Sequence, residues 1–302
     1  MNSASAARFL APEVTELLVG SSSIEGRFRI RVFVPIRDRL RCEAFPVLYA
    51  TDADYFFPTL CDIASQIQMY GEMQRAVIVG IGYEQTADAH ALRWRDFLTF
   101  EQRDAFGEVI DSVVSSPFLA GSQTARAIRD RSDARHFARF IQSELAPMIE
   151  ARYPVRRGPR GYLGYSAGAT FGLQLMGIAP ELCSTLILGS PAVSYGRAEL
   201  AAQLTQSIPH HLAVQRCVFL SVGEQEEFGS PYRFCSGYYS VAELLQAIAP
   251  ELHLVRRIFP GETHATAWLP AFAHGLKAMF PAHHPELPWL EKGERSSTVN
   301  DG

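Results

Sequence analysis

The sequence lacks the residue patterns that mark several common classes of protein. Its five cysteines are scattered and form no CxxC pair, so neither a disulfide framework nor a zinc site is expected. It has no HExxH motif, and we expect no metal. No apolar run is long enough to span a membrane, and the first residues lack the apolar core of a signal peptide. A cytoplasmic protein is therefore expected.

Charge is nearly balanced, and lysine is almost absent. The net charge is −4 over 302 residues, which gives no reason to expect nucleic acid or an anionic membrane as a partner. Lys277 and Lys292 are the only lysines among 28 basic residues. Because arginine is the default cation of this chain, an arginine at one position is weak evidence for an anion-binding site.

A nicotinamide cofactor is not expected either. Gly80-Ile-Gly82 follows an apolar run, as the start of a dinucleotide-binding loop would. Position 85, however, is a glutamine where that loop needs its third glycine. We therefore expect a protein without an organic cofactor.

The sequence does contain an apolar, strand-like run that turns abruptly at a serine. The turn is Gly164-Tyr-Ser-Ala-Gly168, and small and apolar residues continue from it at helical spacing. Gly-x-Ser-x-Gly between a strand and a helix is the nucleophile elbow, whose glycines let strand and helix pass closely. The pattern predicts Ser166 as a nucleophile and the N–H of Ala167 as an oxyanion donor. A glycine-flanked turn without function is the alternative.

Strand-like and helix-like segments alternate along most of the chain. In 27–34 apolar residues alternate with arginines, which is typical of an antiparallel strand near a sheet edge. Other strands are expected at 15–20, 45–50, 76–83, 160–165, 185–190, 218–222 and 252–259, and helices at 57–71, 134–153, 197–206, 240–248 and 269–280. The order predicts an α/β fold with a mostly parallel central sheet, antiparallel N-terminal strands and helices on both faces.

We expect one domain, 1–302, with a core of about 14–283. Residues 84–135 interrupt the alternation with a segment that has no sustained period, and such insertions are often functional loops or lids. A surface excursion is an equal alternative. The polar tail 284–302 is expected to be flexible, and Pro147 should bend the helix that contains it.

Two further polar segments follow predicted strands. The strand that ends at Val222 continues into Gly223-Glu-Gln-Glu-Glu227, and the next strand continues into Gly261-Glu-Thr-His264. Parallel strands carry functional residues at their carboxyl ends. This gives the chain order serine, acid, histidine that α/β-hydrolases have. An acidic cluster elsewhere would ordinarily mark a surface turn.

At these positions the chain resembles the putative-esterase branch of the α/β-hydrolases. That branch contains siderophore (enterobactin-type) esterases, S-formylglutathione hydrolases and antigen 85 mycolyltransferases, and the siderophore esterases look most similar. The resemblance covers about residues 45–281, and its matching segments are the elbow, 46–53, 77–83, 93–96, 137–153, 190–191, 222–226 and 261–264.

The resemblance implies an α/β-hydrolase fold and a serine esterase that acts through an acyl-enzyme on siderophore-like or aromatic esters. Ser166 would be the nucleophile and His264 the base. The family's acid lies three residues after its glycine, which corresponds to Glu226. The family's Asp-Gly is Asp52-Ala53 here, so the second oxyanion donor is the N–H of either Ala53 or Asp54. The alternatives are an acyltransferase of the antigen 85 type and a non-catalytic binding protein on a hydrolase scaffold.

Substrate contacts are expected from the insertion and from the elbow. Arg93, Trp94 and Arg95 follow a strand on the side where the sheet carries function, and Tyr165 precedes the serine. A guanidinium there would suit an anionic or catechol-bearing acyl group, with an aromatic ring stacking nearby. The alternative is an arginine that pairs with Asp96 and only fixes the loop.

Overall fold

The computed structural model describes residues 13–35, 44–84, 89–99, 133–193, 196–208, 217–228 and 233–282. Most of the predicted insertion 84–135 and the whole tail 284–302 lie outside these ranges. The expectations of a lid, a flexible tail and a single domain therefore stay predictions.

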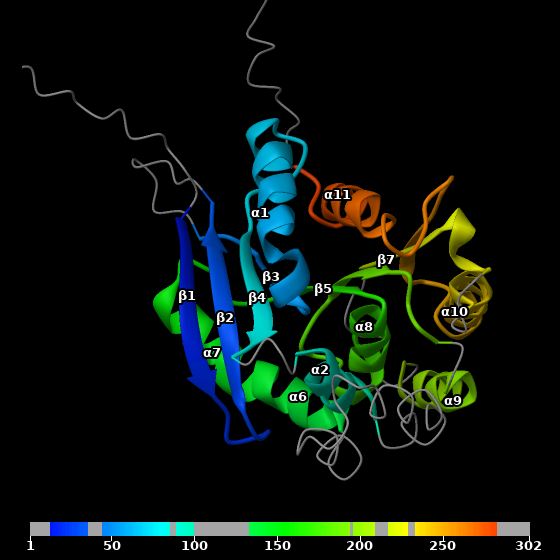
Figure 1. Ribbon diagram of the computed structural model, residues 1–302, viewed down its shortest axis with the longest axis horizontal. Coiled ribbons are helices and arrows are strands. Elements are labelled where there is room, and N and C mark those ends of the chain that lie inside the picture. The colour runs from blue at the N-terminus through cyan, green and yellow to red at the C-terminus, as the bar shows by residue number, and fades with distance from the viewer. Residues whose placement is uncertain are drawn as a thin grey trace, which may run out of the picture.

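A single sheet runs through the described part of the chain (Figure 1). Its eight strands lie in the order β1 (Glu13–Gly20), β2 (Arg27–Val34), β4 (Val77–Tyr83), β3 (Val47–Ala50), β5 (Gly161–Tyr165), β6 (Thr185–Gly189), β7 (Cys217–Gly223) and β8 (His253–Phe259). The pairs β1–β2 and β2–β4 are antiparallel, and every pair from β4 to β8 is parallel. The predicted mostly parallel sheet with antiparallel N-terminal strands is confirmed.

Strand β2 has the two-sided character that its alternation predicts. Phe28, Ile30 and Val32 are buried on one face. Arg29 and Arg31 lie on the other face, within 3.6 and 3.0 Å of Glu16 on the edge strand β1. The strands from β3 to β7 are instead buried almost throughout, as continuous apolar runs require.

Helices cover both faces of the sheet (Figure 1). On one face, α1 (Ala53–Met69) and α11 (Trp268–Met279) share an apolar core with the sheet. The larger core on the other face contains side chains of α2 (Ala89–Phe97), α6 (Ala134–Phe140), α7 (Ala146–Arg152), α8 (Ala167–Ile178), α9 (Arg197–Ser207) and α10 (Phe234–Ile248). No helix within the described ranges has both the length and the apolar character that crossing a membrane requires.

Two helical segments differ from what the sequence predicts. Between α6 and α7 the chain widens into a π-helical turn, η2 (Ile141–Leu145), directly before Pro147 lies in the first turn of α7. Proline has no N–H to donate and disturbs the preceding turn, so the irregularity falls where it was expected. Helix α2, in contrast, lies inside the insertion that has no sustained period, and the sequence did not predict it.

The tight packing of α8 on the sheet provides a test of the fold. A methyl group at Gly172 would come within 2.4 Å of Leu188 Cδ2 and 2.7 Å of Tyr162 Cε1. In a solvent-exposed helix, Gly→Ala raises the free energy of unfolding by up to about 1 kcal/mol. Overpacking a core instead lowers it by about 1–3 kcal/mol. We expect Gly172→Ala to lower the melting temperature by several degrees. Gly20→Ala is the control, since nothing lies within 4 Å of its methyl. A higher melting temperature for Gly172→Ala would contradict this packing.

Candidate active site

The predicted elbow is a strained turn between β5 and α8. Ser166 has φ 57° and ψ −122°, a conformation that costs a non-glycine residue about 1–3 kcal/mol. A methyl group at Gly164 would come within 2.3 Å of the Gly168 carbonyl oxygen, and one at Gly168 within 2.6 Å of Thr51 Oγ1. Backbone atoms therefore leave no space for a side chain at Gly164, and the side chains of Thr51 and Asp52 leave none at Gly168.

Two helices begin beside this turn. Within α1, Tyr55 and Phe56 donate the first backbone hydrogen bonds, both to Asp52 O, at 3.0 and 3.2 Å. The N–H groups of Ala53 and Asp54 precede these donors and have no acceptor within the helix. The N–H of Ala167 holds the same position in α8. These are the candidate oxyanion donors, and each belongs to the positive end of a helix dipole.

A buried hydroxyl pair connects the two helix starts. Tyr162 donates a hydrogen bond to the carbonyl of Gly168 at 2.7 Å. Its hydroxyl also lies 2.9 Å from Thr51 Oγ1. Thr51 immediately precedes the turn into α1, so this chain of contacts fixes the spacing between the candidate donors.

The structure brings Glu226 and His264 together. Glu226 lies in the short helix η4 (Glu224–Glu226) after β7, and its side chain is fully buried. Its Oε2 lies 2.6 Å from Nδ1 of His264. Its Oε1 accepts hydrogen bonds from the N–H of Gly223 at 2.7 Å and from Ser190 Oγ at 2.6 Å. Both carboxylate oxygens therefore have partners at ordinary hydrogen-bond distances.

The two neighbouring glutamates have other contacts. Glu224 Oε2 accepts a hydrogen bond from the N–H of Gly261 at 2.9 Å. Glu227 accepts two from Ser236, at 2.9 and 2.6 Å, and these bonds lower the pKa of its carboxyl. Among the contacts of the described residues, the one that reaches the imidazole comes from Glu226.

Two aromatic rings hold the imidazole. The ring of Phe234, from α10, stacks on His264 at a centroid distance of 4.1 Å and 15°. The ring of Tyr165 lies 4.9 Å away at 30°, and its hydroxyl donates to the His264 carbonyl at 2.8 Å. Burial, together with Glu226, raises the pKa of Tyr165 well above its usual value, so the hydroxyl stays a neutral donor.

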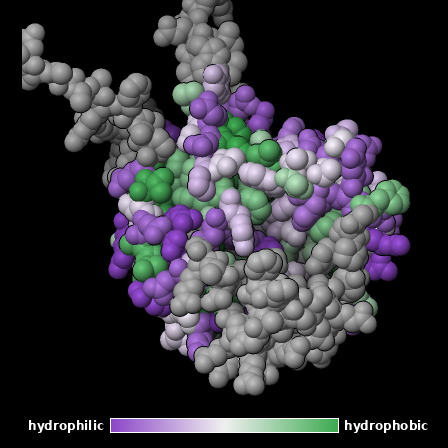
Figure 2. Space-filling model, in the orientation of Figure 1, coloured by the Kyte–Doolittle hydropathy of each residue, from purple (hydrophilic) through white to green (hydrophobic). Residues whose placement is uncertain are grey.

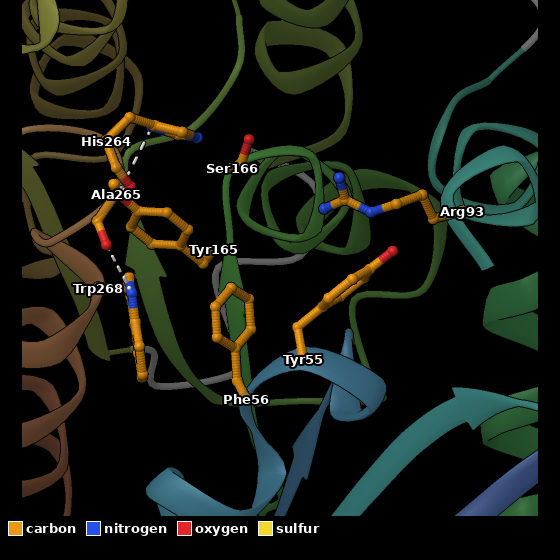
Figure 3. Close-up of a pocket in the computed structure, with 8 residues that line it drawn as sticks. All are labelled: Tyr55, Phe56, Arg93, Tyr165, Ser166, His264, Ala265 and Trp268. Carbon is orange, nitrogen blue, oxygen red and sulfur yellow. Dashed lines mark hydrogen bonds between the residues drawn. The ribbon is translucent and has the colours of Figure 1, made fainter. Parts of the chain in front are cut away.

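A cavity of about 360 Å³ opens over these groups (Figure 3). In Figure 3 the Ser166 hydroxyl lies between the imidazole of His264 on one side and the guanidinium of Arg93 on the other. Aromatic rings form most of the remaining wall, which consists of Tyr55, Phe56, Tyr165 and Trp268, with Ala265 beside them. In the part of the chain that the structure describes, no three His, Cys, Asp or Glu side chains gather closely enough to hold a metal ion.

The three candidates in the insertion have different surroundings. Arg93 lines the cavity, and its Nε and Nη2 donate to Asp52 Oδ1 and Oδ2 at 2.9 and 2.7 Å. Arg95 is buried and donates to both carboxylate oxygens of Asp96, at 2.5 and 3.0 Å. Trp94 is buried too, and neither it nor Arg95 is among the described residues that line the cavity. Their expected contact with substrate finds no support in this placement, whereas the loop-fixing ion pair is present.

The sequence patterns did not identify several residues of the site. Tyr55 and Phe56 lie in the first turn of α1, just after Asp52, and Trp268 begins α11 shortly after His264. This proximity to predicted site residues was a signal that could have found them. The contacts that Ser190 and Phe234 make are different, because they join segments about 30 to 36 residues apart and leave no local pattern.

Known proteins resemble this chain in sequence and in fold. The ferri-bacillibactin esterase BesA of Bacillus subtilis (strain 168) is 26% identical over 262 residues, which cover 82% of each chain. The siderophore hydrolase EstB of Aspergillus nidulans superposes with a TM-score of 0.69 at 16% identity, over 90% of this chain and 96% of its own. An IroE-like serine hydrolase of Shewanella oneidensis gives 0.67 at 18%, over 89% and 80%.

These similarities confirm the α/β-hydrolase fold that the resemblance implies. The family described as putative esterases matches residues 111–279, more than half of the sequence. The matched region contains the elbow at Ser166, the acidic turn at Glu226 and His264. The chain therefore belongs to the putative esterase family.

Proposed function

We propose that this chain is a serine carboxylic-ester hydrolase that acts through an acyl-enzyme. The observation that carries the proposal is a buried carboxylate bonded to a histidine that shares a cavity with Ser166, itself on a strained turn. Glu226, His264 and Ser166 are the acid, base and nucleophile of a catalytic triad. A cytoplasmic location belongs to the same proposal.

The hydrogen bond between His264 and Glu226 determines which nitrogen of the imidazole can act in the reaction. The Nδ1 of His264 faces Glu226 Oε2, so Nε2 is the nitrogen left to act as base. It takes the proton of Ser166 Oγ as this oxygen attacks the ester carbonyl carbon. The tetrahedral intermediate collapses when Nε2 returns the proton to the leaving alcohol oxygen. Water then attacks the acyl-enzyme by the same route and releases the acid.

The negative charge of each intermediate falls on the former carbonyl oxygen. The N–H of Ala167 and that of Ala53 or Asp54 stabilise it, because both groups lie at helix N-termini and are fixed before the reaction begins. The Tyr162 hydroxyl, bonded to Gly168 and in contact with Thr51, keeps the two sets of donors in register.

The cavity favours an ester with a polar acyl half. Because the leaving oxygen must reach Nε2, the alcohol half lies beside His264 and Trp268, and the acyl half extends toward Arg93 and Tyr55 (Figure 3). Asp52 engages Nε and Nη2 of Arg93, which leaves Nη1 to donate to the acyl group. Siderophore-like and aromatic esters fit this division. The relatives named ferri-bacillibactin esterase and siderophore hydrolase support the former.

Removal of the nucleophile tests the core of the proposal. Ser166→Ala should keep the melting temperature close to wild type and reduce ester hydrolysis by about 10³-fold or more, as is usual for triad members. Initial rates on p-nitrophenyl acetate and labelling by a fluorophosphonate probe measure the loss. A variant that keeps a tenth of the activity would show that the elbow serine is not the nucleophile, and wild-type protein that resists the probe would favour a non-catalytic binding role.

Three neighbouring carboxylates give the acid an internal control. We expect Glu226→Gln to lower kcat by about 10²-fold or more, because the imidazole loses the charge that stabilises its protonated form. Glu224→Gln and Glu227→Gln should stay within a few-fold of wild type, since both residues contact backbone or serine groups. If all three variants are mild, the enzyme works as a Ser–His dyad. If Glu227→Gln alone is damaging, the acid is Glu227.

The two arginines of α2 separate substrate binding from fold stability. Arg93→Lys keeps a cation for Asp52 but removes the Nη1 donor. It should raise KM about tenfold for a catecholic or acidic ester and barely change hydrolysis of p-nitrophenyl acetate, which does not reach that far. Arg95→Lys is the matched variant and should lower the melting temperature and affect both substrates alike. Equal losses on both substrates for Arg93→Lys would make that residue structural as well.

A further inference from the structure

Strained backbone in the described ranges is concentrated around the cavity. The non-glycine residues there with a left-handed backbone are Asp52, Ser166, Ser190 and Arg233. Asp52 precedes α1 and Ser166 is the elbow serine, while Arg233 precedes Phe234, which stacks on His264. Ser190, with φ 46°, follows the last residue of β6. Since glycine adopts this conformation without strain, a serine at position 190 calls for a reason that lies in its side chain.

That side chain is buried and bonded to the acid. Ser190 is 1% exposed, and its Oγ donates to Glu226 Oε1 at 2.6 Å. Its backbone N–H donates to the carbonyl of Ser221 on β7 at 2.8 Å. The residue is thus fixed to the strand that carries the acidic turn, with its hydroxyl directed at the carboxylate.

The carboxylate has a defined orientation as a result. Two donors hold Oε1, namely the N–H of Gly223 and the hydroxyl of Ser190, and Oε2 is left for His264. Hydrogen bonds to an ionised carboxylate are about twice as strong as neutral ones, and this carboxylate is fully buried. Without the Ser190 hydroxyl, Oε1 would keep one donor, the N–H of Gly223, and the plane of the carboxylate would be held less firmly against the imidazole.

We propose that Ser190 is a positioning residue, which holds the Glu226 carboxylate in the plane that orients His264. The inference rests on the proposed function. It extends the chain of contacts to a fourth side chain and explains why a strained serine occupies a position that glycine would suit better.

The substitution Ser190→Gly separates this role from a structural one, because it relieves the backbone and removes the hydroxyl together. We expect an unchanged or higher melting temperature, a kcat lowered roughly tenfold to a hundredfold, and an unchanged KM for p-nitrophenyl acetate. Ser221→Ala is the matched control: Ser221 is buried on β7, its Oγ has no hydrogen-bond partner among the described residues, and the backbone carbonyl that Ser190 uses is kept. This control should retain wild-type kcat.

Two readouts show whether Ser190 acts through Glu226. In a Glu226→Gln background, Ser190→Gly should cost little further activity, since residues that act as one unit are not additive. The far-downfield proton resonance of the His264 Nδ1–H should shift or broaden in Ser190→Gly and stay in place in Ser221→Ala.

The outcomes are separable. Wild-type kcat in Ser190→Gly, or an equal fold loss in both backgrounds, overturns the proposal while a damaging Glu226→Gln still supports the triad. A harmless Glu226→Gln removes the acid assignment and this proposal with it. Should Ser190→Gly fail to fold, Ser190→Ala, which keeps the strain but lacks the hydroxyl, must show the same loss of kcat, and wild-type kcat in that variant overturns the proposal.

Discussion

The close approach of β5 and α8 is the constraint on which the rest of the site depends. A side chain at Gly164 would collide with the backbone of Gly168, so the chain can reverse between them only through the strained conformation of Ser166. That reversal lifts the hydroxyl to the sheet edge where β3, β6, β7 and β8 also end. Residues far apart in the sequence thereby come close together, because each loop that leaves this edge of the sheet needs only a few residues to reach the serine.

The sheet also explains why strain persists around the cavity. Asp52, Ser166 and Ser190 follow β3, β5 and β6, which lie side by side and are buried almost throughout. Buried parallel strands with helices on both faces supply the packing energy that over-determines these conformations. The strained residues lie in loops at the strand ends and do not interrupt the core. The packing energy of the core therefore offsets the conformational strain of these residues.

The sequence revealed those features that local chemistry controls. Continuous apolar runs predicted the buried strands, and the alternation in 27–34 predicted β2. Strand-end motifs predicted that Ser166, the acidic turn at 223–227 and His264 would gather, and the family resemblance selected Glu226 within that turn. The sequence failed for α2, since a nine-residue helix whose residues contact the core on several sides has no clean period. The burial of Trp94 and Arg95 was invisible for the same reason, and contacts between distant segments, such as that of Ser190, exist only once the strands are paired.

Two carboxylates, those of Asp52 and Glu226, are buried while their partners Arg93 and His264 face the cavity. The Asp52 side chain is 2% exposed against 11% for Arg93, and that of Glu226 is 0% exposed against 39% for His264. Removing the more exposed partner of such a pair leaves a buried carboxylate without its hydrogen-bond donor, which is destabilising. Alanine substitution at Arg93 or His264 would therefore mix loss of function with loss of fold. Changes that keep a cation for Asp52, or that alter the carboxylate side of the Glu226 pair, report on the chemistry more cleanly, and the geometry of the site dictates that choice.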